Sequence, residues 1–171
     1  SSPSRGLGDV YKRQEQIVAA GELPEGLFQH IVGSGSKVAT GFFDNGIDKL
    51  FFTGSVPAGK TLMAQAAQTL TPVSLELGGN DPMLVLEDAD LERATNGAAW
   101  GGYQNAGQSC GGVERVYVVD AVYDQFVDLL AKKTRQLRHG IGCSGFDVDI
   151  GSLTTAGQLR TVQQHVEDAL A

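Results

Sequence analysis

The sequence predicts an α/β fold whose strands pair mainly in parallel, and three observations carry that prediction. Apolar strand-like segments alternate with segments in which apolar residues recur at helical spacing. Many of the 23 glycines fall where strand-like segments end, as tight turns require. The chain shows no internal repeat. Alternating strands and helices are typical of parallel sheets, because each parallel connection must cross back over the sheet.

Individual residues indicate where the elements of the first half begin and end. Gly21 would close a first helix, and loosely alternating apolar residues predict a strand over 27–32. Ser36 suits the N-cap of a second helix. A short apolar run predicts the next strand over 49–53. Pro57 suits the first turn of the helix that follows, because its missing N–H is not needed there.

In the second half, short apolar runs predict strands and longer periodic segments predict helices. The strands are expected over 72–77, 83–86 and 115–119. Amphipathic spacing predicts a helix over 121–138. The remaining elements expected along the chain are helices over 15–20, 36–43, 57–70, 88–103 and 154–171.

Composition excludes several classes of function. The 171 residues carry a net charge of −7, whereas nucleic-acid binding calls for clustered Lys and Arg. No apolar run reaches the length of a membrane span, and no secretory signal is visible. Two cysteines are too few for a disulfide framework, so a cytoplasmic location is expected. The three histidines lack ligand spacing, and no metal site is predicted.

The two ends of the chain are treated separately. Residues 1–14 show no helical or strand period and resemble translated adapter DNA, so we expect a non-native tail. A genuine flexible tail is the alternative. The last helical pattern, over 154–171, reaches the final residue without a cap or a glycine. We therefore expect the sequence to be a segment of a larger protein.

Two glycine-containing strand-to-helix turns are candidates for phosphate binding. One runs from Gly33 to Gly35, and the other contains Gly54 and Ser55. Glycine allows a phosphate to approach the backbone, and the following helix offers free N–H groups and its positive dipole end. Neither turn has the G-x-G-x-x-G spacing, so a plain strand-to-helix connection stays an alternative for each.

A thiol and a carboxylate are the candidate catalytic groups. Cys110 lies in the run Asn-Ala-Gly-Gln-Ser-Cys-Gly-Gly, and Glu76 lies in Leu-Glu-Leu-Gly-Gly. A thiolate can add to a carbonyl carbon and later leave, and a carboxylate can activate the water that releases the product. Taken alone, Cys110 could be a small buried apolar residue and Glu76 a solvated turn residue. Cys143 lies in a loop without a partner base, and no role is assigned to it.

Together these runs resemble the aldehyde dehydrogenase superfamily, from about Glu22 to the C-terminus. The matching positions are Glu76-Leu77-Gly78-Gly79, Pro82, Asn105, Gly107, Gln108 and Cys110. The resemblance implies oxidation of an aldehyde to a carboxylic acid with NAD or NADP. It assigns Cys110 as the nucleophile, with its backbone N–H in the oxyanion hole, and Glu76 as the base that activates water.

The same resemblance implies residues that contact the cofactor. They belong to the two glycine turns and to the end of the strand that carries Glu76. They are Gly33, Gly35, Phe52, Thr53, Gly54, Ser55, Ala58, Glu76 and Leu77.

The resemblance also implies a domain organisation. Residues 15–77 would form the second half of a Rossmann-like NAD(P)-binding domain, and residues 78–171 the first part of an α/β catalytic domain. The family's oxyanion Asn, ribose-binding Lys and Glu, and oligomerisation strand would lie outside this segment. We therefore expect little activity from the segment alone and a homo-oligomer for the whole protein.

Two other functions stay open. The first is a thiol acyl-transfer enzyme, either an esterase or a CoA-acylating aldehyde dehydrogenase; Glu76 favours hydrolysis, because acyl transfer to CoA needs no base for water. The second is a non-catalytic remnant of the fold, against which the presence of both Cys110 and Glu76 argues.

Overall fold

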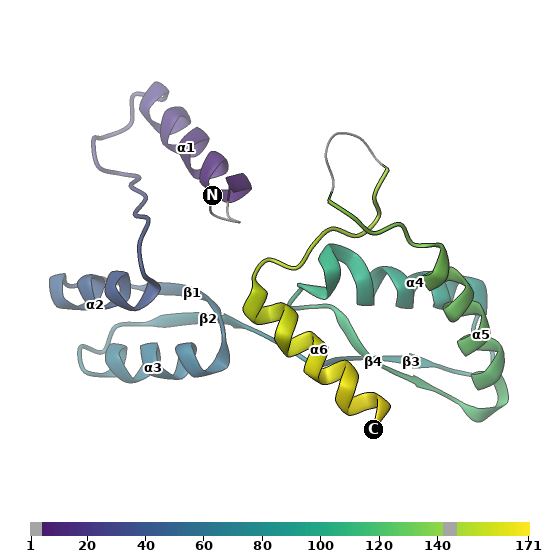
Figure 1. Cartoon of the computed structure of the whole chain (residues 1–171). Coiled ribbons are helices and arrows are strands. Elements are labelled where there is room, and N and C mark those ends of the chain that lie inside the picture. Colours follow the sequence, from purple (N-terminus) through teal and green to yellow (C-terminus); the bar gives the residue numbers. More distant parts are fainter. Residues whose placement is uncertain (1–4, 142–146) are drawn as a thin grey trace. The chain divides into compact units, whose positions relative to one another are not determined.

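The computed structural model describes residues 5–141 and 147–171, which form two compact units (Figure 1). The first unit contains Ser1–Phe52 and Pro57–Leu75, and the second contains Thr53–Val56 and Glu76–Ala171. The elements in order are α1 (Arg5–Ala20), α2 (Gly35–Asn45), β1 (Leu50–Gly54), α3 (Val56–Ala67), β2 (Val73–Leu77), β3 (Asp81–Val85), α4 (Leu91–Tyr103), the 3-10 turn η1 (Gln104–Gly107), β4 (Val113–Val118), α5 (Asp120–Gln136) and α6 (Ala156–Leu170).

The first unit is built on the two-stranded sheet of β1 and β2, with α2 and α3 beside it (Figure 1). The backbone N–H of Leu50 donates to the carbonyl oxygen of Pro72 at 3.0 Å, where the two strands begin. Helix α3 buries Leu62 and Ala66, which lie one helical turn apart on one face. Helix α2 ends at Gly46, whose φ of 76° is accessible to glycine at little cost.

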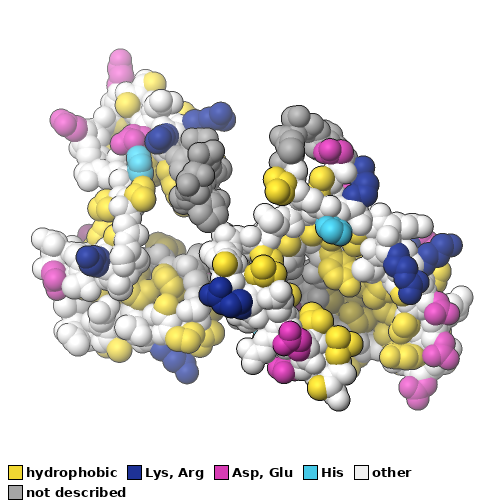
Figure 2. Space-filling model, viewed as in Figure 1, with side chains coloured by type: hydrophobic (Ala, Val, Ile, Leu, Met, Phe, Trp, Pro, Cys, Tyr) yellow, Lys and Arg dark blue, Asp and Glu magenta, His cyan; other side chains and the backbone are white. Residues whose placement is uncertain are grey.

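The second unit has a parallel pair of strands, β3 and β4, with α4 and α5 packed against it. Its core joins Val85 of β3, Ala98 of α4 and Phe126 of α5. Successive strand residues point to opposite faces, so the paired residues Leu84 and Tyr117 are exposed on the other face of the sheet. Large apolar side chains remain on the surface of both units (Figure 2).

The parallel ladder is irregular at its start. Asp81 pairs with Val113, but the next residue, Pro82, pairs with Arg115. Glu114 is therefore an extra residue on β4, which makes this position a β-bulge. Proline has no N–H to offer the ladder, so Pro82 can pair only through its carbonyl, and from the Pro82–Arg115 pair onward the register is regular.

The predicted α/β alternation is confirmed, with one wrong element. The strand predicted over 27–32 does not form, and Ile31 and Val32 are 64% and 92% exposed. The described strands pair only as β1 with β2 and β3 with β4, so this segment has no partner. A strand requires a hydrogen-bonded neighbour, which local alternation cannot supply.

The next observations concern the N-terminal helix α1, the C-terminal helix α6 and the loop that contains Cys143. The described part of residues 1–14 is helical, because α1 begins at Arg5, although the sequence there shows no helical period. That residues 1–14 are a non-native tail stays a prediction. Helix α6 begins at Ala156 after Thr155, whose hydroxyl oxygen accepts from the N–H of Gln158. Cys143 lies outside the described residues.

Among residues 5–141 and 147–171, no helix is both long and apolar enough to cross a bilayer.

Candidate active site

The loop that carries Cys110 is built from left-handed backbone. Asn105 and Ala106 have φ values of 51° and 57°, and Gly107 follows with a φ of 73°. This region disfavours residues with a Cβ, and strained conformations of this kind cluster at functional sites. The chain thus turns sharply after α4 and places Cys110 in an exposed turn ahead of β4.

Gln108 fixes the shape of this loop through both ends of its amide. Its Nε2 donates to the backbone oxygen of Asn105 at 2.9 Å, and the Asn105 Nδ2 donates back to the Gln108 carbonyl at 2.9 Å. Its Oε1 accepts from the backbone N–H of Thr154 at 2.8 Å and from the Thr154 hydroxyl at 2.7 Å. The loop is therefore tied to the segment that precedes α6.

Gly79 brings the Glu76 segment against the Cys110 loop. A Cβ at Gly79 would lie 3.1 Å from the backbone oxygen of Cys110 and 2.8 Å from Oδ1 of Asp81. A side chain at Gly79 would press on both atoms, so the absence of a Cβ favours this approach. Because β2 ends at Leu77, the Gly78–Gly79 link holds the end of the strand that carries Glu76 close to the thiol loop.

The side chains of Glu76 and Cys110 are both exposed to solvent. Within residues 5–141 and 147–171, neither side chain makes a hydrogen bond or an ion pair. An exposed thiol is open to an electrophile, and an exposed carboxylate is open to water. These two groups suit covalent catalysis in which one adds to carbon and the other activates water.

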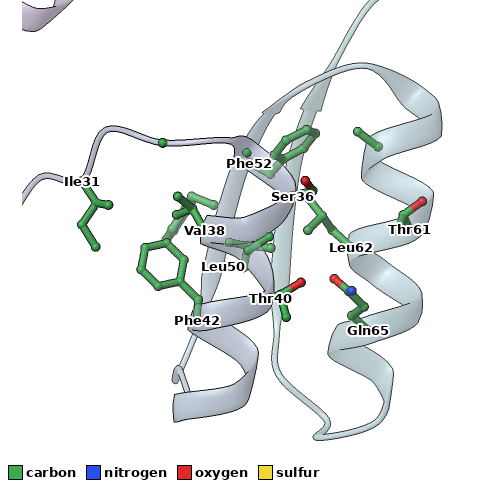
Figure 3. Close-up of a pocket in the computed structure, with 15 residues that line it drawn as sticks. Ile31, Ser36, Val38, Thr40, Phe42, Leu50, Phe52, Thr61, Leu62 and Gln65 are labelled. Carbon is green, nitrogen blue, oxygen red and sulfur yellow. The ribbon is translucent and has the colours of Figure 1, made fainter.

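The first unit contains a cavity of about 630 Å³ between α2 and α3 (Figure 3). Its walls are mainly apolar, and Val38, Leu50, Phe52 and Leu62 are among the residues that form them. A volume of this size lies within the ~300–1,000 Å³ range of small-molecule sites. Gly33 and Gly35 line the cavity where α2 begins, so free helix N–H groups lie at its rim.

The predicted cofactor residues divide into two groups. Gly33, Gly35, Phe52 and Ala58 line the cavity. The others do not line it: Thr53, Gly54, Ser55 and Glu76 are exposed, and Leu77 is half-buried. The sequence analysis did not identify the residues of α2 and α3 that face the cavity. Their helical spacing could have indicated these lining residues: Ser36, Val38, Ala39, Thr40, Phe42, Thr61, Leu62 and Gln65.

Acidic, cysteine and histidine side chains do not gather into a metal centre in the described part of the chain. Residues 5–141 and 147–171 contain no group of three or more of these side chains that could hold a metal ion.

The chain is similar in sequence to proteins of a known family. The sequence profile of the aldehyde dehydrogenase family matches residues 12–171, and the chain belongs to this family. It is 43% identical over 150 residues to glutarate-semialdehyde dehydrogenase of Pseudomonas aeruginosa, covering 87% of this chain and 31% of that protein. It is 41% identical over 157 residues to an NADP(+) succinate-semialdehyde dehydrogenase of Escherichia coli, covering 91% and 32%.

A solved structure agrees with this assignment. The crystal structure of an NAD-dependent aldehyde dehydrogenase from Sinorhizobium meliloti superposes with a TM-score of 0.89 at 30% identity, covering 97% of this chain and 33% of that one. The Rossmann-like α/β class is therefore confirmed. The chain spans about a third of the length of these relatives.

Proposed function

We propose that this chain supplies the nucleophile, the base and part of the cofactor site of an NAD(P)-dependent aldehyde dehydrogenase. One observation carries the proposal. The exposed Cys110 loop lies against Gly79, three residues after the exposed carboxylate of Glu76. The family match adds support, because it spans both groups.

The reaction at the thiol would proceed in two stages. The thiolate of Cys110 adds to the aldehyde carbon to form a tetrahedral thiohemiacetal, and loss of hydride leaves a thioester. Glu76 then takes a proton from water, which attacks the thioester carbon and releases a carboxylic acid and the thiol. The backbone N–H of Cys110 would stabilise the oxyanion in both stages.

The residues of the first unit fit a dinucleotide. The apolar walls of the cavity suit a planar aromatic base, and Gly33 and Gly35 at the start of α2 suit a phosphate. A bound nicotinamide ring would supply the hydride acceptor. One relative is named for NADP(+) and one solved structure for NAD, so the cofactor is written as NAD(P).

The substrate class follows from the names of relatives. Two of them are named for semialdehydes, which carry a carboxylate at the far end from the aldehyde. We propose an aldehyde of this class as the first to test. Cytoplasmic location and assembly of the whole protein into a homo-oligomer stay predictions.

Ester hydrolysis tests the thiol and the base without requiring a cofactor. The chain is mixed with p-nitrophenyl acetate, and mass spectrometry identifies the acetylated cysteine. The proposal predicts acetyl-Cys110, formed as the thiolate displaces p-nitrophenolate. Cys110→Ser should abolish this adduct, and Cys143→Ser is the matched control that should retain it.

Glu76→Gln separates the two stages. Acetylation of Cys110 should persist, because it needs no water. Release of acetate should slow by about 10²-fold to 10⁴-fold, the usual contribution of a general base. Acetate release at the unchanged rate would remove Glu76 from the mechanism. Acetylation of another residue in place of Cys110 would exclude Cys110 as the nucleophile.

A further inference from the structure

Glu114 is not among the predicted site residues. It lies between the segment that carries the thiol and the segment that carries the base. Its Oε2 accepts a hydrogen bond from the backbone N–H of Asp81 at 2.6 Å. Its Oε1 lies 3.5 Å from where a Cβ of Gly112 would be, two residues after Cys110. The carboxylate thus hydrogen-bonds to the segment that carries the base, and Glu114 itself lies on the strand that follows the Cys110 loop.

The bulge explains why a side chain is needed at this position. Glu114 has no partner in the register between β3 and β4, because Asp81 pairs with Val113 and Pro82 with Arg115. The ladder is interrupted here, and a backbone N–H that loses its ladder partner requires another acceptor. The Glu114 carboxylate serves as that acceptor for Asp81. A charged acceptor makes a shorter and stronger hydrogen bond than a neutral one.

A second bond holds the same junction. Nη2 of Arg115 donates to the backbone oxygen of Asn80 at 2.6 Å. Neighbouring side chains of β4 therefore hold consecutive residues, Asn80 and Asp81, at the start of β3. The residue before them is Gly79, whose backbone packs against the backbone oxygen of Cys110.

We propose that Glu114 is a positioning residue that sets the distance between Glu76 and Cys110. The inference rests on the proposed function for those two groups. Loss of the Glu114 bond would remove one of the bonds that hold the Gly79–Asp81 link to β4, leaving the Arg115 bond to Asn80, and the base could then shift relative to the thioester. Acetylation needs the thiol alone, whereas release needs thiol and base together, so release should suffer more.

The experiment compares Glu114→Ala with Glu114→Gln in the full chain. Glutamine keeps a carbonyl acceptor at the same reach, and alanine removes it. We expect Glu114→Ala to slow acetate release from acetyl-Cys110 by about tenfold to a hundredfold, the scale of a small misplacement of reacting groups. The rate at which Cys110 is acetylated in Glu114→Ala should stay within about threefold of the wild-type rate, a much smaller change than the slowing of acetate release. Glu114→Gln should restore most of the release rate.

Glu87→Ala is the control, because Glu87 is an exposed glutamate of the same unit on the turn after β3. It should leave both rates unchanged. Equal slowing of acetylation and release in Glu114→Ala, or no rescue by glutamine, would overturn the positioning role.

Hydrogen exchange distinguishes this inference from the proposed function. The Asp81 amide should exchange faster in Glu114→Ala than in the wild type, whether or not Cys110 accepts an acetyl group. Unchanged exchange at that amide would overturn the inference by itself. If the wild type formed no acetyl-Cys110 but the variant exchanged faster at Asp81, the proposed function would be contradicted. The hydrogen bond between Glu114 and Asp81 would still be supported.

Discussion

The cavity of the first unit and the Cys110 loop of the second unit are built in opposite ways. The cavity is lined mainly by apolar side chains of regular elements, α2, β1 and α3. The loop is held by left-handed backbone and by hydrogen bonds between side chains and main chain. The shape of the cavity therefore depends on side-chain volume, and the shape of the loop depends on backbone geometry. Substitutions that add the same atoms should have different consequences in the two regions.

Among the substitutions that compare the two regions, the largest effect is expected for Gly79→Ala, which adds a single methyl group beside the Cys110 loop. The new Cβ would lie 2.8 Å from Oδ1 of Asp81 and 3.1 Å from the backbone oxygen of Cys110. Because a backbone atom cannot move aside cheaply, the loop has to shift. We expect acetylation of Cys110 to slow by about a hundredfold. Gly78→Ala is the matched control, since its Cβ would meet nothing within 4 Å.

Gly101→Ala tests whether the second unit can accept an added methyl group where α4 packs against β4 without losing stability. Its Cβ would lie 2.7 Å from Cγ2 of Val113, so we expect a loss of about 1–3 kcal/mol in the free energy of unfolding. Gly97→Ala in the same helix meets only Cε of Met83, at 3.9 Å. It should gain about 0.5–1 kcal/mol from helix propensity. Denaturant unfolding measures both, and equal values for the two variants would contradict the packing described here.

Ala58→Phe adds volume to the wall of the cavity. The cavity can hold a larger side chain, so the fold should remain while the space for a ligand shrinks. We expect the Kd for NAD or NADP to rise by at least about tenfold, the equivalent of losing one good contact. Ala64→Phe, on an exposed position of α3, is the control that should bind normally. Equal binding by both variants would place the dinucleotide elsewhere.

The smallest effect concerns a bridge on the surface of the second unit. Hydrogen bonds from Arg138 lower the pKa of the Asp149 carboxyl from its ordinary value of 3.8 to about 2. A carboxyl with a lowered pKa stabilises the fold above its unfolded pKa, and this contribution is lost as the pH falls toward 2. Arg138→Gln should return the NMR titration midpoint of Asp149 toward 3.8. A midpoint that does not move would contradict the bridge.

The sequence predicted the regular elements well because their signals are local. Apolar periodicity located α3 and α5, and Pro57 marked the first turn of α3. The strand over 27–32 failed, because pairing depends on a partner far along the chain. The predicted division at residues 77 and 78 stays a prediction; along this stretch of the chain the first compact unit ends at Leu75 and the second continues from Glu76.

The candidate site was only partly visible in the sequence. Motif spacing indicated Cys110 and Glu76, but it could not show that Asn105 and Ala106 adopt left-handed backbone. That conformation is set by the hydrogen bonds of Gln108, one of which reaches Thr154. The role of Glu114 depends on a register shift that becomes visible only when β3 and β4 pair.

The most direct measurement is ¹³C NMR of the chain with a semialdehyde labelled at its carbonyl carbon. The account predicts a protein-bound tetrahedral carbon attached to the sulfur of Cys110, present in Cys143→Ser and absent in Cys110→Ser. A bound tetrahedral carbon that survives in Cys110→Ser would show that another group attacks the aldehyde and would contradict the account.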